Sequence, residues 1–217
     1  MDVFECIKKR RTVHKYKDEP VSDSDLYKIL DAGRWAPSAA NRQPVRFIVI
    51  KDNNTKQRIY DLVKEVLEMG AEVRERAGAT RVQALSPYAQ GNINMKVPAM
   101  ICVVADKFHT DTIYYSQTHH RSAACAAIQN MMLAARALGL GTVWLTFWDP
   151  VRIQHLLHIP INYEVVGIIP VGHPVEFPEL PLSSVWHHSP ARKDITEVAY
   201  SEKFGNKYSA PAGMSER

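Results

Sequence analysis

The sequence predicts an α+β fold of layered α/β type, with a central mixed sheet flanked by helices. Short runs rich in β-branched residues alternate with longer stretches of helical periodicity. One such stretch, residues 121–141, is apolar around most of its circumference, as expected of a central helix. No linker-like stretch divides the chain, so we expect a single domain over residues 1–217.

The first half of that pattern gives two helices, a strand and a third helix. Ser22 followed by Asp25 is a helix-start signal, and Gly33 with Pro37 predicts where that helix ends. A short helix precedes it near the N-terminus. The run 46–50 is typical of a buried strand, and Asn54 or Thr55 is expected to begin the next helix. Residues 70–95 lose periodicity, and we expect them to be a partly helical, mobile excursion.

The second half continues the alternation. We expect strands at 99–105, 142–147 and 164–172, with the central helix ended by Gly139 and Gly141. Asp149 is expected to cap a short helix that begins at Pro150. The tail from Pro174 is Pro-rich and leads into an extended or strand-forming arm, with residues 205–217 as a flexible tail.

Composition limits the class of function. Of 217 residues, 46% are apolar and 23% are charged, which is ordinary for a globular protein. The formal charge of +4 suits anionic small molecules better than nucleic acid. No apolar run approaches the roughly 20 residues of a membrane span, and no signal-peptide core is visible, so we expect a cytoplasmic location and no membrane partner. The three cysteines lie far apart and are interpreted as reduced thiols.

The basic stretch "KRRTVHKY" is the first candidate binding segment. If residues 10–14 are extended, Arg10, Thr12 and His14 lie on one side. A guanidinium, a hydroxyl and an imidazole together suit a dianionic phosphate. A solvated basic patch is the alternative. The glycine-rich phosphate motifs of Rossmann and P-loop proteins are absent from the sequence.

The stretch "PSAANRQP" is the second candidate. Its small residues at 38–40 would let a planar ring approach the backbone closely, and Asn41 offers both a donor and an acceptor. The pyrimidine edge of a flavin presents such alternating groups. An ordinary loop between a helix and a strand is the alternative for this segment alone.

Five ordered blocks together resemble the FMN-dependent nitroreductase family. "RRTVHKYKDEPV" and "APSAANRQPVRFIVI" are similar to the opening and second blocks of that family. "AAIQNMMLAARALGLGTVWL" resembles its central helix and following strand, "EVVGIIPVGHP" its late strand, and "RKDITEV" its C-terminal block. The blocks extend from residue 10 to about residue 205, so the resemblance covers nearly the whole chain.

The resemblance implies a homodimer that binds FMN at the subunit interface, with a C-terminal arm reaching the partner. It implies ping-pong transfer from NADH or NADPH, through FMN, to a small acceptor such as a nitroaromatic or quinone. Arg10, Arg11 and Thr12 would bind the phosphate and ribityl groups, with His14 beside them and Arg192 completing the phosphate site. Thr146 and Phe147 would lie on the N5 side of the ring. The partner subunit would line the ring with Pro37, Ser38, Ala39 and Asn41.

The sequence also departs from the family pattern. His14 stands where Arg or Lys is usual, so its charge depends on pH. Thr12 replaces Ser, Val45 replaces a common Trp, and His173 replaces a frequent Tyr. These changes leave the class of acceptor open.

Three alternatives remain beside an FMN-dependent oxidoreductase that uses NADH or NADPH. "GLGTVWLTFWDP" also resembles the flavin-fragmenting dimethylbenzimidazole synthases, although helix capping explains Asp149 more simply. A reductive dehalogenase would use residues 70–95 as a substrate lid. A non-catalytic flavin-binding or flavin-storing protein is the alternative from another class. We expect no metal site, because the histidines lack a ligand pattern such as HExxH, and no hydrolase, because a nucleophile elbow is missing.

Overall fold

The computed structural model describes residues 1–76, 96–107, 118–178 and 193–209. The chain forms two compact units, residues 1–178 and 179–217, and each is described by itself. The expected single domain therefore stays a prediction. Among the described residues, no helix has the length and apolar character that crossing a membrane requires.

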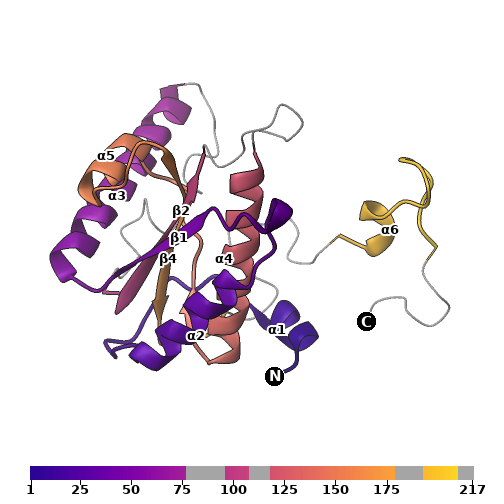
Figure 1. The fold of residues 1–217 in the computed structure, drawn as a ribbon, viewed down its shortest axis with the longest axis horizontal. Helices are drawn as coiled ribbons and strands as arrows, with labels where there is room; N and C mark the ends of the chain where they lie inside the picture. The colour runs from indigo at the N-terminus through magenta and orange to yellow at the C-terminus, as the bar shows by residue number, and fades with distance from the viewer. Residues whose placement is uncertain (77–95, 108–117, 179–192, 210–217) are drawn as a thin grey trace. The chain divides into compact units, whose positions relative to one another are not determined.

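The first unit is built around a four-stranded sheet with the order β1-β2-β4-β3 (Figure 1). Its strands are β1 (Val45–Ile50), β2 (Ala99–Asp106), β3 (Gly141–Thr142) and β4 (Tyr163–Gly172). The three strand pairs are antiparallel. The mixed character expected of the sheet comes from one isolated parallel bridge between Thr12 and Thr142.

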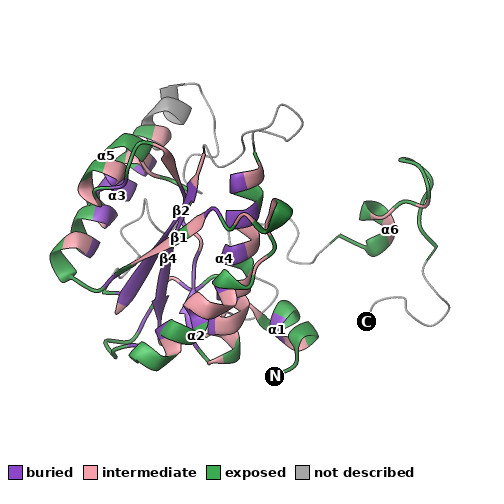
Figure 2. Ribbon diagram, viewed as in Figure 1, coloured by how far each residue is buried: buried purple, intermediate pink, exposed green. Residues whose placement is uncertain are grey.

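Helices cover both faces of this sheet (Figure 1). On one face lie α3 (Asn53–Arg76) and α5 (Pro150–Leu156), and on the other lie α2 (Asp23–Arg34) and α4 (His119–Ala137). Strand β2 is buried from Ala99 to Ala105, because alternate residues enter separate cores (Figure 2). Cys102 packs with Ile59 and Ile153, whereas Ile101 packs with Ile29 and Ile128. The expected layered α+β fold is confirmed.

One helix boundary agrees with the prediction and one differs. Helix α2 ends at Arg34, between Gly33 and Pro37, and a Cβ at Gly33 would lie 2.8 Å from Met131 and 2.9 Å from Phe47. This glycine permits close packing of α2 against α4 and β1. Asp52, rather than Asn54 or Thr55, caps α3, accepting the Thr55 N–H at 2.7 Å.

Two segments for which other structure was also expected contain helix. Helix α3 continues to Arg76, which agrees with the partly helical structure expected in 70–95, and residues 77–95 lie outside the described residues. In the second unit, Ile195–Val198 forms α6 instead of an extended arm. The physical reason is a capping box, in which Asp194 accepts the Thr196 N–H at 2.8 Å and Glu197 accepts the Asp194 N–H at 3.1 Å. The arm's reach to a partner stays a prediction.

The strand expected at 142–147 is mostly absent. Only Gly141–Thr142 pairs with β4, and Leu145 rejoins it through an isolated bridge to Ile168. Between them the indole of Trp144 lies over Gly167, where a Cβ would come within 2.6 Å of its Nε1 atom. The bulky ring lifts the chain away from the ladder and leaves residues 143–149 as a loop.

Candidate functional site

The segment after α1 (Val3–Lys9) is fixed against β3. The Val13 N–H donates to the Thr142 carbonyl at 3.0 Å, and the Tyr16 hydroxyl donates to the Val13 carbonyl at 2.7 Å. Val13 is buried, and a Cβ at Gly141 would lie 2.8 Å from it. Only glycine therefore permits this approach, which holds residues 10–14 beside β3.

The polar side chains of this segment differ in exposure and in the direction in which they point. Thr12 is exposed, and Arg10 and His14 are half-buried, while Val13 between them enters the core. This placement agrees with the alternation expected of an extended segment. Arg11 turns back toward α1, where its Nη1 donates to the carbonyls of Lys8 at 2.6 Å and Arg10 at 2.8 Å.

His14 differs in charge from the Arg or Lys that is usual at its position in the family. Burial lowers the pKa of its imidazole below the ordinary value of 6.5. The side chain is therefore mainly neutral at pH 7. It can donate or accept a hydrogen bond there, but it brings little positive charge.

The loop 143–149 presents Thr146 and Phe147 to solvent. At its centre, Leu145 exchanges backbone hydrogen bonds with Ile168, with N–O distances of 2.9 Å and 3.4 Å. At its end, the Asp149 carboxylate accepts the N–H groups of Val151 at 2.9 Å and Arg152 at 3.1 Å, which confirms the expected cap. Thr146 and Phe147 are exposed between these anchors. Because Thr142 also pairs with Thr12, this loop starts beside the 10–14 segment.

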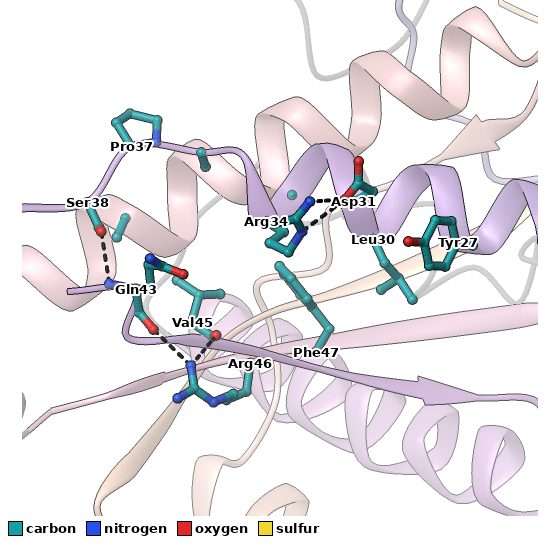
Figure 3. A pocket seen from close by; sticks show the side chains of 13 residues that line it. Tyr27, Leu30, Asp31, Arg34, Pro37, Ser38, Gln43, Val45, Arg46 and Phe47 are labelled. Atoms are coloured by element: carbon teal, nitrogen blue, oxygen red, sulfur yellow. Dashed lines mark hydrogen bonds and ion pairs between the residues drawn. The ribbon is translucent and has the colours of Figure 1, made fainter. Parts of the chain in front are cut away.

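The connection from α2 to β1, residues 35–44, has an unusual backbone. Ala40, Asn41 and Gln43 have φ values of +49°, +54° and +49°, a region that residues with a Cβ rarely adopt. Ser38 Oγ accepts the Gln43 N–H at 2.9 Å, and Arg46 Nη1 donates to the Gln43 carbonyl at 2.8 Å (Figure 3). No sequence pattern signals this backbone, because "AANRQP" contains no glycine.

A cavity of about 450 Å³ lies between this loop, α2 and β1 (Figure 3). Its wall is mainly apolar, and at its rim Arg34 pairs with Asp31 at 2.6 Å. Pro37 and Ser38 are the predicted site residues that line it, together with Leu30, Val45, Phe47, Gln43 and Arg46.

The predicted site residues thus form three groups. Arg10, Arg11, Thr12 and His14 lie on a segment joined by the Thr12–Thr142 bridge to the strand that leads to Thr146 and Phe147. Pro37, Ser38, Ala39 and Asn41 form a separate group after α2, as expected if they serve the partner's site. Arg192 lies outside the described residues. Within the described part of the chain, no three His, Cys, Asp or Glu side chains gather to hold a metal ion.

Comparison with known proteins identifies the family of this chain. The model of the nitroreductase family matches residues 7–173. A protein of Archaeoglobus fulgidus named as an NADH dehydrogenase/NAD(P)H nitroreductase is 32% identical over 177 residues, which cover 78% of this chain and 86% of the relative. A nitroreductase of Desulfovibrio desulfuricans, solved in complex with FMN, has a TM-score of 0.63 at 27% identity, covering 94% of this chain and 98% of that one.

Two further relatives carry other names. An iodotyrosine deiodinase of Nematostella vectensis is 27% identical over 83% of this chain and 70% of its own length. A 5,6-dimethylbenzimidazole synthase of Rhodospirillum rubrum is 26% identical over 79% of this chain and 82% of its own length. All of these similarities span most of the described sheet and its helices. The chain belongs to the nitroreductase family.

Proposed function

We propose that this protein is an FMN-dependent oxidoreductase. It transfers reducing equivalents from NADH or NADPH, by a ping-pong reaction through bound FMN, to a small acceptor such as a quinone or a nitroaromatic. The observation that carries this proposal is the Thr12–Thr142 pairing, which joins a phosphate-type donor segment to the strand leading into the exposed Thr146–Phe147 loop. Family membership supports the same conclusion.

The donor set of the chain fits FMN. Arg10 and Thr12 offer a guanidinium and a hydroxyl from one pinned segment, which suits a phosphate and the adjoining ribityl hydroxyls. Arg11 would leave the carbonyls of α1 to contribute, and His14 would act as a neutral hydrogen-bonding group. Arg192 is proposed as a second cation at the phosphate.

The ring would lie against Thr146 and Phe147. Backbone N–H groups of this loop would stabilise negative charge that develops near N5. Bound FMN supplies the hydride chemistry itself, while the protein positions it and sets the electrostatic surroundings. The two anchors of the loop, at Leu145 and Asp149, keep these donors in place.

A second copy of the chain would complete the site with Pro37, Ser38, Ala39 and Asn41. Large apolar side chains on the surface support such an assembly, since Phe4, Tyr27 and Trp35 are 73%, 70% and 72% exposed. We therefore propose a homodimer.

The flavin-fragmenting and dehalogenating activities are second candidates, because relatives named for them cover most of the chain. The Asp149 carboxylate is occupied by two N–H groups of α5, which supports its structural role over a role in flavin fragmentation.

An acceptor survey of the FMN-loaded protein tests the proposal. We expect NADH or NADPH oxidation to depend on an added quinone or nitroaromatic, with the flavin recovered intact. Dimethylbenzimidazole formed from FMN and oxygen would instead identify the fragmenting activity, and iodide released from an iodophenol would identify the dehalogenase. FMN binding without any turnover would indicate a storage protein.

A further inference from the structure

We propose that Gln43 is a positioning residue that orients the side-chain amide of Asn41, so that Asn41 meets the flavin ring as a hydrogen-bond donor. This inference rests on the proposed function, because it concerns a group that would face FMN across the subunit interface. It adds a residue and a direction of hydrogen bonding that the family resemblance did not supply.

Gln43 is held at its backbone N–H, its backbone carbonyl and its side-chain Nε2. Its N–H donates to Ser38 Oγ at 2.9 Å, and its carbonyl accepts from Arg46 Nη1 at 2.8 Å (Figure 3). Arg46 Nη1 also donates to the Val45 carbonyl at 2.8 Å, which fixes the guanidinium. The Gln43 side chain then donates from Nε2 to Asn41 Oδ1 at 3.1 Å. A residue anchored in this way has little freedom to release Asn41.

The bond from Gln43 decides which end of the Asn41 amide faces outward. An asparagine amide offers an oxygen acceptor on one end and an NH₂ donor on the other, and a half-turn about its last bond exchanges them. With Oδ1 engaged by Gln43, the Nδ2 donor is the end left to meet a ligand. The positive φ of Asn41 sets the direction of its Cα–Cβ bond as well.

The Ser38 hydroxyl is also oriented as a hydrogen-bond donor. Its Oγ accepts the Gln43 N–H, so its hydroxyl hydrogen remains to donate. Ser38 and Asn41 thus both present donors, and both are set by Gln43. The matching groups on a flavin are the acceptors of its pyrimidine edge, namely the carbonyl oxygens and an unprotonated ring nitrogen.

The strained backbone agrees with this role. Three residues without glycine's freedom hold positive φ within four positions, and such strain concentrates at functional sites. Both Asn41 and Gln43 are exposed in the protomer, so packing in the core does not explain their geometry.

Gln43→Glu is the direct test. The carboxylate cannot donate to Asn41 Oδ1, so the Asn41 amide turns over and presents an acceptor to the ring. We expect FMN affinity, measured by fluorescence titration, to fall about tenfold at pH 7, because an acceptor would then oppose an acceptor. Below the ordinary glutamate pKa of about 4.3 the protonated side chain can donate again, so the loss relative to wild type should shrink as pH falls from 7 to about 4.

A double-mutant cycle separates positioning from general loop damage. In an Asn41→Ala background, Gln43→Glu should cost FMN affinity less than about twofold beyond Asn41→Ala alone. Gln43→Met, which lacks both donor and charge, should show the same dependence on Asn41 with a smaller loss. Gln57→Glu is the matched control, since Gln57 donates in the same way to Asp61 on α3 at 2.9 Å, and it should leave FMN affinity unchanged.

Equal losses with and without Asn41, or wild-type affinity in Gln43→Glu and Gln43→Met, would overturn the inference. Those results leave the proposed function standing, because the wild-type chain would still bind FMN. A wild-type chain that binds no FMN would overturn both.

Discussion

The two connections that would meet the flavin ring are secured in opposite ways. Residues 35–44 contain three non-glycine residues at positive φ, held by hydrogen bonds that converge on Gln43. Residues 143–149, all of them described, contain none at positive φ and are secured by the Leu145–Ile168 bridge and the Asp149 cap. One connection is strained and cross-linked by side chains, whereas the other uses ordinary strand and helix-end contacts.

The difference separates stability from binding. Strained residues each cost on the order of 1–3 kcal/mol, and they persist where the surroundings over-determine them. We therefore expect changes in 35–44 to act mainly on FMN affinity. Changes that loosen 143–149 or the strand before it should act mainly on folding stability.

The largest change in unfolding free energy is expected at Gly141, in the strand that precedes residues 143–149. Gly141→Ala would place a Cβ 2.8 Å from Val13 and push the 10–14 segment away from β3. Denaturant unfolding should show a loss of about 2–3 kcal/mol, and FMN affinity should fall with it. Gly70→Ala on α3, where a Cβ meets nothing within 4 Å, should be neutral or stabilising. Wild-type stability in Gly141→Ala would show that the close approach to Val13 is unimportant.

Removing the cap at the end of the same connection should have a moderate effect. Asp149→Ala leaves the Val151 and Arg152 N–H groups without their acceptor and should cost about 1 kcal/mol of unfolding free energy. Ser22→Ala, which removes the cap of α2, should cost a similar amount. FMN affinity should fall slightly in Asp149→Ala, because this cap helps to hold the loop that carries Thr146 and Phe147, and it should not change in Ser22→Ala. A variant of Asp149 that keeps its stability but loses reactivity would instead favour a chemical role.

In the strained connection the expected change is smaller and opposite in sign. Ala40→Gly relieves a φ of +49° and should raise the free energy of unfolding by about 0.5 kcal/mol. FMN affinity should nevertheless fall several-fold, because the freer loop must be ordered on binding. His158→Gly relieves a φ of +52° after α5 and should leave FMN affinity unchanged. Unchanged or tighter FMN binding in Ala40→Gly would contradict the role given to the strain.

The smallest change in stability is expected at His14, in the segment 10–14 that lies beside β3. Burial lowers the pKa of His14 in the folded chain, so the unfolded chain binds more protons below the ordinary value of 6.5. The stability that neutral His14 contributes is therefore present above that value and is lost as pH falls through the folded pKa.

His14→Gln tests this dependence. Unfolding free energies measured at pH 7, 6 and 5 should decline less steeply in His14→Gln than in wild type. His155→Gln, which changes an exposed histidine on α5, is the comparison. An unchanged slope in His14→Gln would show that His14 is not the group responsible.

Patterns read along the chain predicted the layers well. The apolar run of β2 is buried, and apolar residues cover most of the circumference of the Ala- and Met-rich helix α4, whose Met131 and Met132 lie in the core. The cap at Asp149 and the helix end at Gly139, with a φ of +78°, follow from local chemistry. Such features depend on neighbours in sequence.

Features that depend on distant partners were missed or wrong. The close approach of Met131 and Phe47 to Gly33 was missed, and the strand predicted at 142–147 is interrupted where Trp144 lies over Gly167. The candidate site shows the same limit, since nothing in "AANRQP" reveals that Gln43 connects Ser38, Asn41 and Arg46. The candidate binding residues follow from the family resemblance, whereas their orientation depends on the folded chain.

The most direct measurement is the anaerobic mixing of the FMN-loaded protein with NADH or NADPH in a stopped-flow spectrophotometer. We expect the absorbance of oxidised flavin to bleach with at least one of the two nicotinamides, and to return when a quinone or a nitroaromatic is added. Failure of the purified protein to take up FMN, or bound FMN that neither nicotinamide reduces, would contradict an FMN-dependent oxidoreductase.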